Sequence, residues 1–211
     1  MKFHGIEKVR QFFKENPKRI VIMRGLPGSG KSTLTAEINS WSEDGAYDAY
    51  VCSSDSFFVD NHGVYRFDPK MLPVNHAKCF QKYIEAVRHM SLTTTVAPPS
   101  DTIIVDNTNT VFADMIPYCR VAEAYRVPFI IVEILCDPQT SLARNVHGVP
   151  IEVIFGMYKN LITDQLPGYL KRVVLQPETK EEQAAREAWV RPTEVSSTYV
   201  PEGRDKSGVI D

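Results

Sequence analysis

The chain has 211 residues and a formal net charge of −2, with 43% hydrophobic and 24% charged residues. This ordinary globular composition is enough for a real core, and the small net charge excludes a protein that attracts polyanions over its whole surface. The length suits one α/β domain with a short appendage, and no apolar run approaches the length of a membrane span.

Two local features of the composition bear on partners and location. Residues 1–24 hold seven Lys and Arg against two Glu, a surplus that either contacts nucleic acid or, as the favoured interpretation, forms the solvated face of an N-terminal helix.

Cys52, Cys119 and Cys136 lie in or beside apolar runs, and no C-x-x-C pair is present, so we interpret the cysteines as reduced and buried. Because the N-terminus also lacks the apolar core of a secretory signal, we expect an intracellular, cytoplasmic protein without membrane contact.

Short apolar runs alternate with helical patterns along the chain, which is typical of a parallel sheet covered by helices. Strands are expected at residues 19–23, 50–54, 102–106 and 128–135. Helices are expected at residues 34–41, 76–90, 114–126, 138–145 and 150–162. Pro117 is expected to interrupt the third of these helices. From residue 176 onward the sequence is polar and rich in proline, which predicts a short surface helix followed by a loose tail.

The stretch "GLPGSGKST" at residues 25–33 has the Gly-x-x-x-x-Gly-Lys-Ser spacing of a Walker-type phosphate loop, and it joins a predicted strand to a predicted helix. The glycines let backbone N–H groups turn toward a β-phosphate at the N-terminus of the helix. Lys31 is expected to bridge the β- and γ-phosphates, and the Ser32 hydroxyl to bind Mg²⁺. We therefore predict that ATP and Mg²⁺ are bound by the loop, which comprises Gly25, Leu26, Pro27, Gly28, Ser29, Gly30, Lys31, Ser32 and Thr33.

Two aspartates close apolar strands, at the edge of a parallel sheet where ligands bind. Asp55, in "SSDSFF", is a candidate general base that accepts the proton of an attacking hydroxyl, and the alternative is a helix cap. Asp106, in "TIIVDNTNT", has the Walker B pattern and is the expected second ligand of Mg²⁺. Asn107 and Asn109 follow it, and they either contact substrate or brace the loop, as such residues more often do.

The stretch "LARNVHGVP" at residues 142–150 lies between two predicted helices and indicates a hinged lid. Arg144 is expected to reach over the phosphates and neutralise charge on the transferred group, whereas a surface arginine in a last helical turn is the alternative. His147 is either a second lid contact or a cap of the turn. The chain has no N-K-x-D guanine signature, which favours a kinase over a GTPase switch.

These clusters together predict an α/β fold, a doubly wound parallel sheet of the P-loop kinase type with a helical lid and a short C-terminal extension. We place the N-terminal helix at residues 1–18, the kinase domain at residues 19–175 and the polar extension at residues 176–211.

The sequence resembles the polynucleotide 5′-hydroxyl kinase family, and most closely its eukaryotic-type kinase-like domains. The matching text is "RGLPGSGKST", "SSDSFF…GVYRFDPKML…NHAKC", "IIVDNTNT…MIPYCRVAEAY" and "ARNVHGVPIEVIFGMYKNL", within about residues 20–162. The resemblance implies ATP-dependent transfer of the γ-phosphate to the 5′-hydroxyl of an RNA or DNA end. It implies Lys31 and Ser32 on ATP·Mg²⁺, Asp55 as the base, Asp106 near the metal and Arg144 as the lid arginine.

The chain departs from the phage members of that family at two positions. The phage enzymes carry an acceptor-binding arginine three residues beyond the catalytic aspartate, where this chain has Phe58, and a lid arginine where it has His147. Phe57, Phe58 and Tyr65 offer aromatic faces for stacking an unpaired terminal base, although at least one of the phenylalanines is expected in the core.

The leading functional hypothesis is therefore a metal-dependent polynucleotide 5′-hydroxyl kinase that serves nucleic-acid repair. Its partners would be a nucleoside triphosphate and a nucleic acid 5′ end, and the sequence leaves the oligomeric state open. A kinase for a small metabolite or nucleoside would use the same phosphate-handling residues. A nucleotide-binding interaction module without catalysis is the third possibility, which intact Lys31, Asp55, Asp106 and Arg144 disfavour.

Overall fold

The computed structural model of the protein describes residues 2–41, 49–92, 101–179, 181, 182 and 184. The chain divides into two compact units, residues 1–178 and residues 179–211. In the second unit, the N–H of Thr179 donates to the Glu182 carboxylate at 2.8 Å and the N–H of Glu182 donates to the Thr179 hydroxyl at 3.1 Å. This reciprocal capping box opens a short helical turn. The tail expected beyond residue 184 lies outside the described residues.

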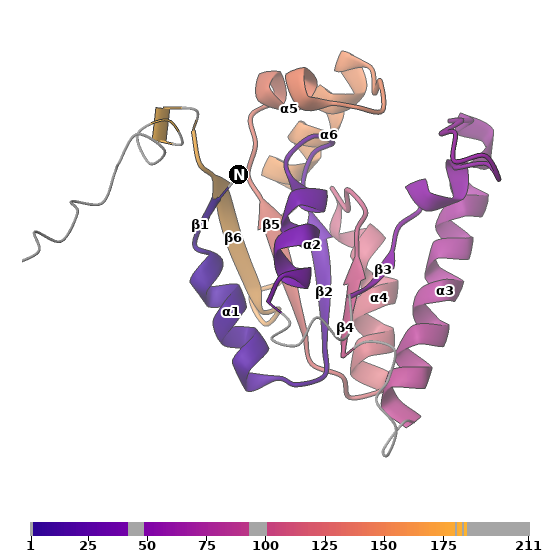
Figure 1. The fold of residues 1–211 in the computed structure, drawn as a ribbon, viewed down its shortest axis with the longest axis vertical. Coiled ribbons are helices and arrows are strands. Elements are labelled where there is room, and N and C mark those ends of the chain that lie inside the picture. The colour runs from indigo at the N-terminus through magenta and orange to yellow at the C-terminus, as the bar shows by residue number, and fades with distance from the viewer. Residues whose placement is uncertain (1, 42–48, 93–100, 180, 183, 185–211) are drawn as a thin grey trace, which may run out of the picture. The chain divides into compact units, whose positions relative to one another are not determined.

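Within the described part of the first unit, six strands form one sheet in the order β1-β6-β5-β2-β4-β3 (Figure 1). The strands are β1 Phe3–His4, β2 Arg19–Arg24, β3 Tyr50–Cys52, β4 Thr102–Val105, β5 Phe129–Ile134 and β6 Arg172–Pro177. Neighbouring strands are parallel except β1, which pairs antiparallel with β6. The predicted α/β fold with a largely parallel sheet is confirmed.

Helices cover both faces of this sheet (Figure 1). They are α1 Ile6–Glu15, α2 Lys31–Asn39, α3 Leu72–Leu92, α4 Phe112–Ala124, α5 Pro138–Arg144 and α6 Ile151–Thr163, with short 3₁₀ helices η1 Asp55–Phe58 and η2 Pro69–Met71. The first two, α1 and α2, pack on one face, while α3 and α4 pack on the other. Helices α5 and α6 lie beyond the carboxyl ends of the strands (Figure 1). No described helix is long and apolar enough to cross a bilayer.

The central strand β2 contributes apolar side chains to both faces of the sheet, and both faces are buried under helices. Its side chains alternate, so that Ile20 and Ile22 enter the core under α3 and α4 while Val21 and Met23 enter the core under α1 and α2. All four are fully buried. A strand between two helix layers needs apolar residues on both sides, which is why the sequence reads as a continuous apolar run rather than an alternating one.

The N-terminal helix and the last strand differ from the expectation. Helix α1 lies within the first compact unit, where Val9 and Phe12 pack with Val173 and Leu175 of β6 in one core. Strand β6 continues to Pro177, past the boundary expected at residue 175. Its exposed and buried residues alternate, because β6 is near the sheet edge, and so short a period-two pattern did not mark it as a strand.

Pro117 lies inside α4 without interrupting it, so the expected break is wrong. A proline removes one N–H donor from a helix, and tertiary packing compensates for that loss here. Met115, Tyr118 and Cys119 on either side of it are buried against the sheet. The hydroxyl of Tyr83 on α3 also donates to the Tyr118 carbonyl at 2.8 Å, which ties the two helices together.

Replacing Phe12 with Ala tests whether α1 belongs to the core. Phe12 is 2% exposed, so we expect Phe12→Ala to lower the free energy of unfolding by about 3–5 kcal/mol, measured by urea denaturation. The exposed Lys14→Ala on the same helix is the control and should change it by less than about 0.5 kcal/mol. Equal, small effects of both changes would show that α1 is not part of the folding unit.

Candidate active site

The phosphate loop connects the end of β2 to the first turn of α2. The Gly25 N–H donates to the Thr108 carbonyl at 2.9 Å, which ties the start of the loop to the segment after β4. A Cβ at Gly25 would lie 2.9 Å from the Ile134 carbonyl of β5, so this position requires glycine. Within the loop, Leu26, Pro27 and Ser29 are buried, while Ser32 and Thr33 are exposed.

The N-terminus of α2 faces the hollow of this loop. Gly30 precedes the helix with φ +106°, a left-handed value that favours glycine. The first N–H groups of a helix have no partner within it, and they carry its partial positive charge. Together with the loop, they form the kind of cradle that binds phosphate groups.

Lys31 lies at the centre of this cradle. Its ammonium donates to the carbonyls of Gly25 at 3.0 Å and Leu26 at 2.7 Å. Burial lowers the pKa of Lys31 from its ordinary value, and the negative charges of Asp106 and Asp55 partly offset that effect. The two predicted acidic residues thus lie close enough to act on the loop lysine. The ammonium is available to a phosphate that displaces it from the two carbonyls.

Asp106 follows the last residue of β4 and faces the first turn of α2. The Ser32 hydroxyl donates to its Oδ2 at 3.5 Å, and its own N–H donates to the Cys52 carbonyl of β3 at 2.9 Å. Burial raises the pKa of Asp106, while the positive charge of Lys31 opposes the rise. A hydroxyl and a carboxylate oxygen side by side are hard oxygen donors of the kind that Mg²⁺ prefers.

The described residues contain no cluster of three or more His, Cys, Asp or Glu side chains that could hold a metal by themselves. The pair formed by Ser32 and Asp106 suits the chemistry of Mg²⁺, which takes one or two protein ligands together with phosphate oxygens and water. These two residues are therefore the ones that fit a metal in this site.

Asp55 is the first residue of η1, just beyond β3. It is not a helix cap, since Ser54 precedes the helix and no side chain caps it. Its carboxylate instead accepts a hydrogen bond from the Tyr65 hydroxyl at 3.5 Å, and its negative charge acts on Lys31 and Asp106. The alternative interpretation of Asp55 as a cap is therefore wrong.

Tyr65 connects Asp55 to the segment that follows α5. The backbone of Tyr65 pairs with that of Val59 in an isolated antiparallel bridge. The centroid of its ring lies 4.6 Å from that of the His147 ring. Burial, with a smaller effect of the Asp55 carboxylate, raises the pKa of Tyr65 to about 12. The hydroxyl therefore stays protonated at neutral pH and remains a hydrogen-bond donor to Asp55.

Helix α5 is docked directly on the phosphate loop. The buried Ser141 hydroxyl donates to the Pro27 carbonyl at 2.6 Å. Gly28 has φ +71°, and a Cβ there would lie 2.7 Å from the Ser141 carbonyl and 3.2 Å from the Arg144 Cβ. Arg144, the last residue of α5, is thereby held beside the tip of the loop. Sequence reasoning missed Ser141, because a lone serine in a helix carries no motif.

The structure gives three of the predicted substrate residues an internal role. Phe58 is 5% exposed and packs on Tyr65 and Phe67. The Asn107 side-chain oxygen accepts hydrogen bonds from the N–H and hydroxyl of Ser54, both at 2.9 Å. The Asn109 amide donates to the Met23 carbonyl at 2.7 Å, with a backbone φ of +46°. These three are corrections to the substrate set: Phe58 is packed in the interior, and Asn107 and Asn109 brace the loops, which was the alternative role expected of them.

Phe57 and His147 are placed differently. Phe57 is half-buried, and the Lys78 ammonium lies 5.8 Å from its ring centroid. His147 is exposed, and its charge acts on Asp106 across the site. Their substrate contacts stay predictions.

Cys136 corrects the expectation that the cysteines are buried. Cys52, Cys79 and Cys119 are buried and Cys136 is only half-buried, although all four are free thiols. Cys136 follows β5 at the edge of the phosphate loop. Burial and the negative charge of Asp137 raise its pKa, and the positive charges of Arg144 and Lys31 partly oppose the rise.

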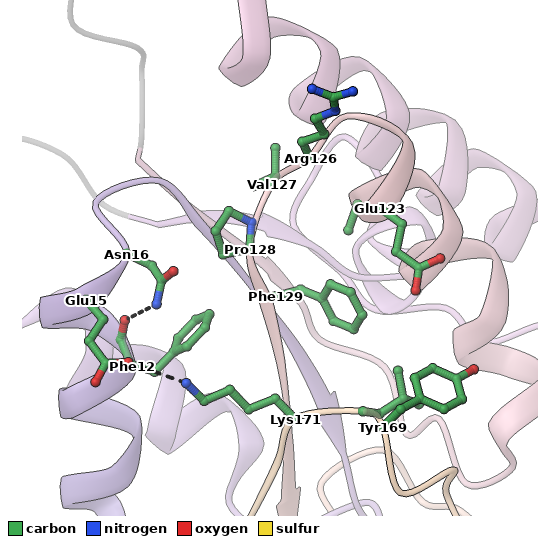
Figure 2. A pocket seen from close by; sticks show the side chains of 12 residues that line it. Phe12, Glu15, Asn16, Glu123, Arg126, Val127, Pro128, Phe129, Tyr169 and Lys171 are labelled. Atoms are coloured by element: carbon green, nitrogen blue, oxygen red, sulfur yellow. Dashed lines mark hydrogen bonds and ion pairs between the residues drawn. The ribbon is translucent and has the colours of Figure 1, made fainter.

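A cavity of about 490 Å³ lies at the opposite edge of the sheet (Figure 2). It is lined by the ends of α1 and α4, the start of β5 and the segment before β6, and the Lys171–Glu15 ion pair of 3.5 Å crosses one side of it. In an open parallel sheet the reacting groups gather at the carboxyl edge, and the phosphate loop and both aspartates are there. This cavity is therefore not the candidate active site.

The fold, the phosphate loop and the two strand-end aspartates define a P-loop domain with a kinase-like fold. Residues 20–147, well over half of the chain, match the AAA domain family AAA_33, and the protein belongs to that family. Human NEDD4-binding protein 2 is 28% identical over 169 residues. The matched region is 74% of this chain but only 9% of that relative.

Two solved structures resemble the chain at low sequence identity. A kinase candidate from Chloroflexus aurantiacus superposes with a TM-score of 0.53 at 14% identity, covering 83% of this chain and 100% of that one. The APS kinase CysC of Mycobacterium tuberculosis, in complex with AMPPNP and APS, gives a TM-score of 0.49 at 16% identity, over 82% of this chain and 95% of that one. The first likeness shows the shared fold.

Gly28→Ala tests the docking of α5 on the phosphate loop. The new methyl group would collide with the Ser141 carbonyl, so we expect ATP affinity, measured by isothermal titration, to fall by about tenfold or more. Gly63→Ala is the matched control, because Gly63 has a similar φ of +78° but no neighbour within 4 Å. Both changes carry the cost of a left-handed Ala, and Gly63→Ala should leave ATP affinity unchanged. Unchanged affinity in both variants would contradict the proposed docking.

Thiol labelling at pH 8 tests the placement of Cys136. Burial raises the pKa of Cys52 to about 12 and of Cys119 to about 11, so both stay protonated and inert in the folded protein. Cys79 is buried as well, and Cys136 is the one half-buried cysteine, so we expect Cys136 to be labelled fastest although burial also raises its pKa. Cys136→Ser should remove this fast phase, and ATP·Mg²⁺ should slow it. A fast phase that persists in Cys136→Ser, or that ATP leaves unchanged, would place Cys136 away from the loop.

Proposed function

We propose that the protein is an ATP-dependent kinase that transfers the γ-phosphate to the 5′-hydroxyl of a polynucleotide end, RNA or DNA. The observation that carries this proposal is the position of Asp55. Its carboxylate does not cap a helix, and its charge acts on the loop lysine. A carboxylate beside the terminal phosphate of a bound nucleotide is what a kinase needs to activate an alcohol, and a protein that only binds nucleotide has no use for it.

The residues around the loop divide the work of phosphoryl transfer. The backbone of residues 25–33 and the N-terminus of α2 would hold the phosphates, and Lys31 would leave its two carbonyls to pair with the β- and γ-phosphates. Ser32 and Asp106 would hold Mg²⁺, which supplies positive charge to the phosphate oxygens. Arg144, beside Gly28 on the other side of the loop, would neutralise charge on the transferred group.

The proton balance follows from the same arrangement. The acceptor hydroxyl gives its proton to Asp55 as its oxygen forms a bond to the γ-phosphorus, and the bond from that phosphorus to the β–γ bridging oxygen breaks. The products are ADP and the phosphorylated acceptor, and Asp55 then releases the proton to water. For this reaction to proceed, the alcohol must replace Tyr65 as the hydrogen-bond partner of Asp55, because the Tyr65 hydroxyl donates to that carboxylate in the structure.

Support for a polynucleotide as acceptor comes from the residues that flank Asp55. Phe57 is half-buried with the Lys78 ammonium near its ring, and Phe67, which packs on Phe58, is 52% exposed. An aromatic face beside a cation suits an unpaired base and its phosphate, since stacking and charge act together on single strands. The motif resemblance to polynucleotide 5′-hydroxyl kinases points the same way. A small-molecule alcohol would use the same phosphate-handling residues, so it is the alternative that the experiment must address.

Transfer of labelled γ-phosphate tests the reaction. We expect wild-type protein with ATP and Mg²⁺ to label 5′-hydroxyl oligonucleotides, and Asp55→Asn to lower the rate by roughly 10²–10⁴-fold while ATP still binds. Lys31→Ala should lose both binding and transfer. Asp114→Asn, an exposed acid in the first turn of α4, is the control and should retain the full rate.

Each alternative has its own outcome in that experiment. Faster labelling of nucleosides or small alcohols than of matched RNA and DNA oligomers would favour a small-molecule kinase. ATP binding without transfer to any acceptor would favour a nucleotide-binding module. Full activity of Asp55→Asn would remove the general base from the mechanism.

A further inference from the structure

Arg24, the last residue of β2, has its guanidinium inside the protein just before the phosphate loop. It is 1% exposed and has the largest side chain among the fully buried residues. An arginine keeps its charge under all ordinary conditions, so burial is tolerated only when its donors are matched by acceptors and a carboxylate. The structure provides both.

The guanidinium binds β5, the strand that leads into the lid. The lid is residues 135–163, which comprise the segment after β5, helix α5, the connecting loop and α6. One terminal nitrogen of Arg24 donates to Glu133 Oε2 of β5 at 3.0 Å. Glu133 is 6% exposed and also pairs with Arg172 at 3.4 Å. A residue at the end of β5, just before the lid, is therefore ion-paired in the interior.

The same guanidinium binds the residue that follows the lid. Its second terminal nitrogen donates to the Asp164 carbonyl at 3.0 Å and lies 3.7 Å from Asp164 Oδ2. Asp164 ends α6 and its carboxylate also accepts a hydrogen bond from the N–H of Phe112. Both ends of the lid thus converge on one side chain at the root of the phosphate loop.

Arg24 also contacts the segment that carries Asp106. Its Nε donates to the Asn109 carbonyl at 3.3 Å, and its second terminal nitrogen donates to the Thr110 carbonyl at 3.1 Å. Three elements that supply groups to the active site, namely the phosphate loop, the segment after β4 and the lid, are therefore bonded to one cation.

A contribution to the free energy of unfolding does not by itself explain why an arginine stands at position 24. Replacing a buried ion pair by well-packed apolar residues is often neutral or stabilising, because desolvation of the charges offsets their attraction. The neighbouring residues of β2 are apolar and fully buried, so an aliphatic side chain would suit a strand in this position. A planar cation that satisfies acceptors from several directions holds geometry in a way that an apolar side chain cannot.

We propose that Arg24 is a positioning residue that clamps both ends of the lid to the root of the phosphate loop, so that Arg144 and the lid are held in register with the bound nucleotide. Arg24 touches no reacting atom in this role. It acts through Glu133 just before the lid and Asp164 just after it. This inference rests on the proposed function only for ATP binding and needs no particular acceptor.

Hydrogen–deuterium exchange and ATP titration of the full chain test the clamp. In Arg24→Lys the ammonium can still pair with Glu133 but cannot reach Asp164 as well, because it lacks the second arm of the guanidinium. We expect the amides of α5 and α6 to exchange about tenfold faster relative to those of β2, and ATP affinity to fall about fivefold or more. Asp164→Asn keeps an acceptor for the Phe112 N–H but loses the negative charge. We expect the amides of α6 to exchange faster in this variant too, by a smaller factor than in Arg24→Lys.

Arg19→Lys is the matched control, at the opposite end of the same strand. Arg19 is a half-buried arginine that donates to the carbonyls of Phe13 at 2.7 Å and Asn16 at 2.9 Å. Its replacement should lower global stability while leaving relative exchange of the lid and ATP affinity unchanged. If Arg24→Lys behaves like Arg19→Lys, its role is structural only and the clamp is refuted.

The outcomes also separate this proposal from the proposed function. Lid exchange without nucleotide reports on the clamp even if the wild-type protein transfers phosphate to no acceptor. Conversely, a wild-type protein that labels oligonucleotides while Arg24→Lys leaves lid exchange and ATP affinity unchanged would keep the kinase and overturn the clamp.

Discussion

The active site depends on the position of β4 between β2 and β3. In the parallel register, Val105 lies opposite Ile22 of β2 and opposite Cys52 of β3. Because parallel strands end at the same edge, the phosphate loop after β2, Asp106 after β4 and Asp55 after β3 emerge together. Residues that are far apart in the chain thus share one electrostatic environment, in which each carboxylate acts on Lys31.

The charges of this site consist of one lysine and two carboxylates that act on it. The charge of Lys31 is partly balanced by the two carboxylates, and its ammonium donates to two peptide carbonyls. These interactions compensate for the burial of the charge. A nucleotide with its metal would replace those carbonyls by phosphate oxygens and place positive charge beside Asp106. The backbone of the loop and the strand ends are fixed by the sheet, whereas the side chains of Lys31 and Asp55 would exchange their present partners for those of a ligand.

The lid and the acceptor side of the site meet at Tyr65 and His147. The hydroxyl of Tyr65 bonds the candidate base while its ring lies against the lid histidine. Tyr65 therefore links the surroundings of Asp55 to His147 in the segment after α5. Ser141 bonds α5 to the phosphate loop through the Pro27 carbonyl, and Arg24 bonds Asp164 at the far end of the lid.

The sequence by itself determined the strand-loop-helix order around Gly25, the positions of Asp55 and Asp106 beyond the ends of their strands and the largely parallel α/β fold, because these follow from local periodicity and short motifs. The tertiary structure decided what depends on residues distant in sequence. It placed Phe58, Asn107 and Asn109 in the interior, joined the N-terminal helix to β6 in one core, and gathered Arg24, Glu133 and Asp164 into one buried cluster. Local patterns report a residue's own backbone preference, whereas burial and ion pairing depend on which distant segments pack beside it.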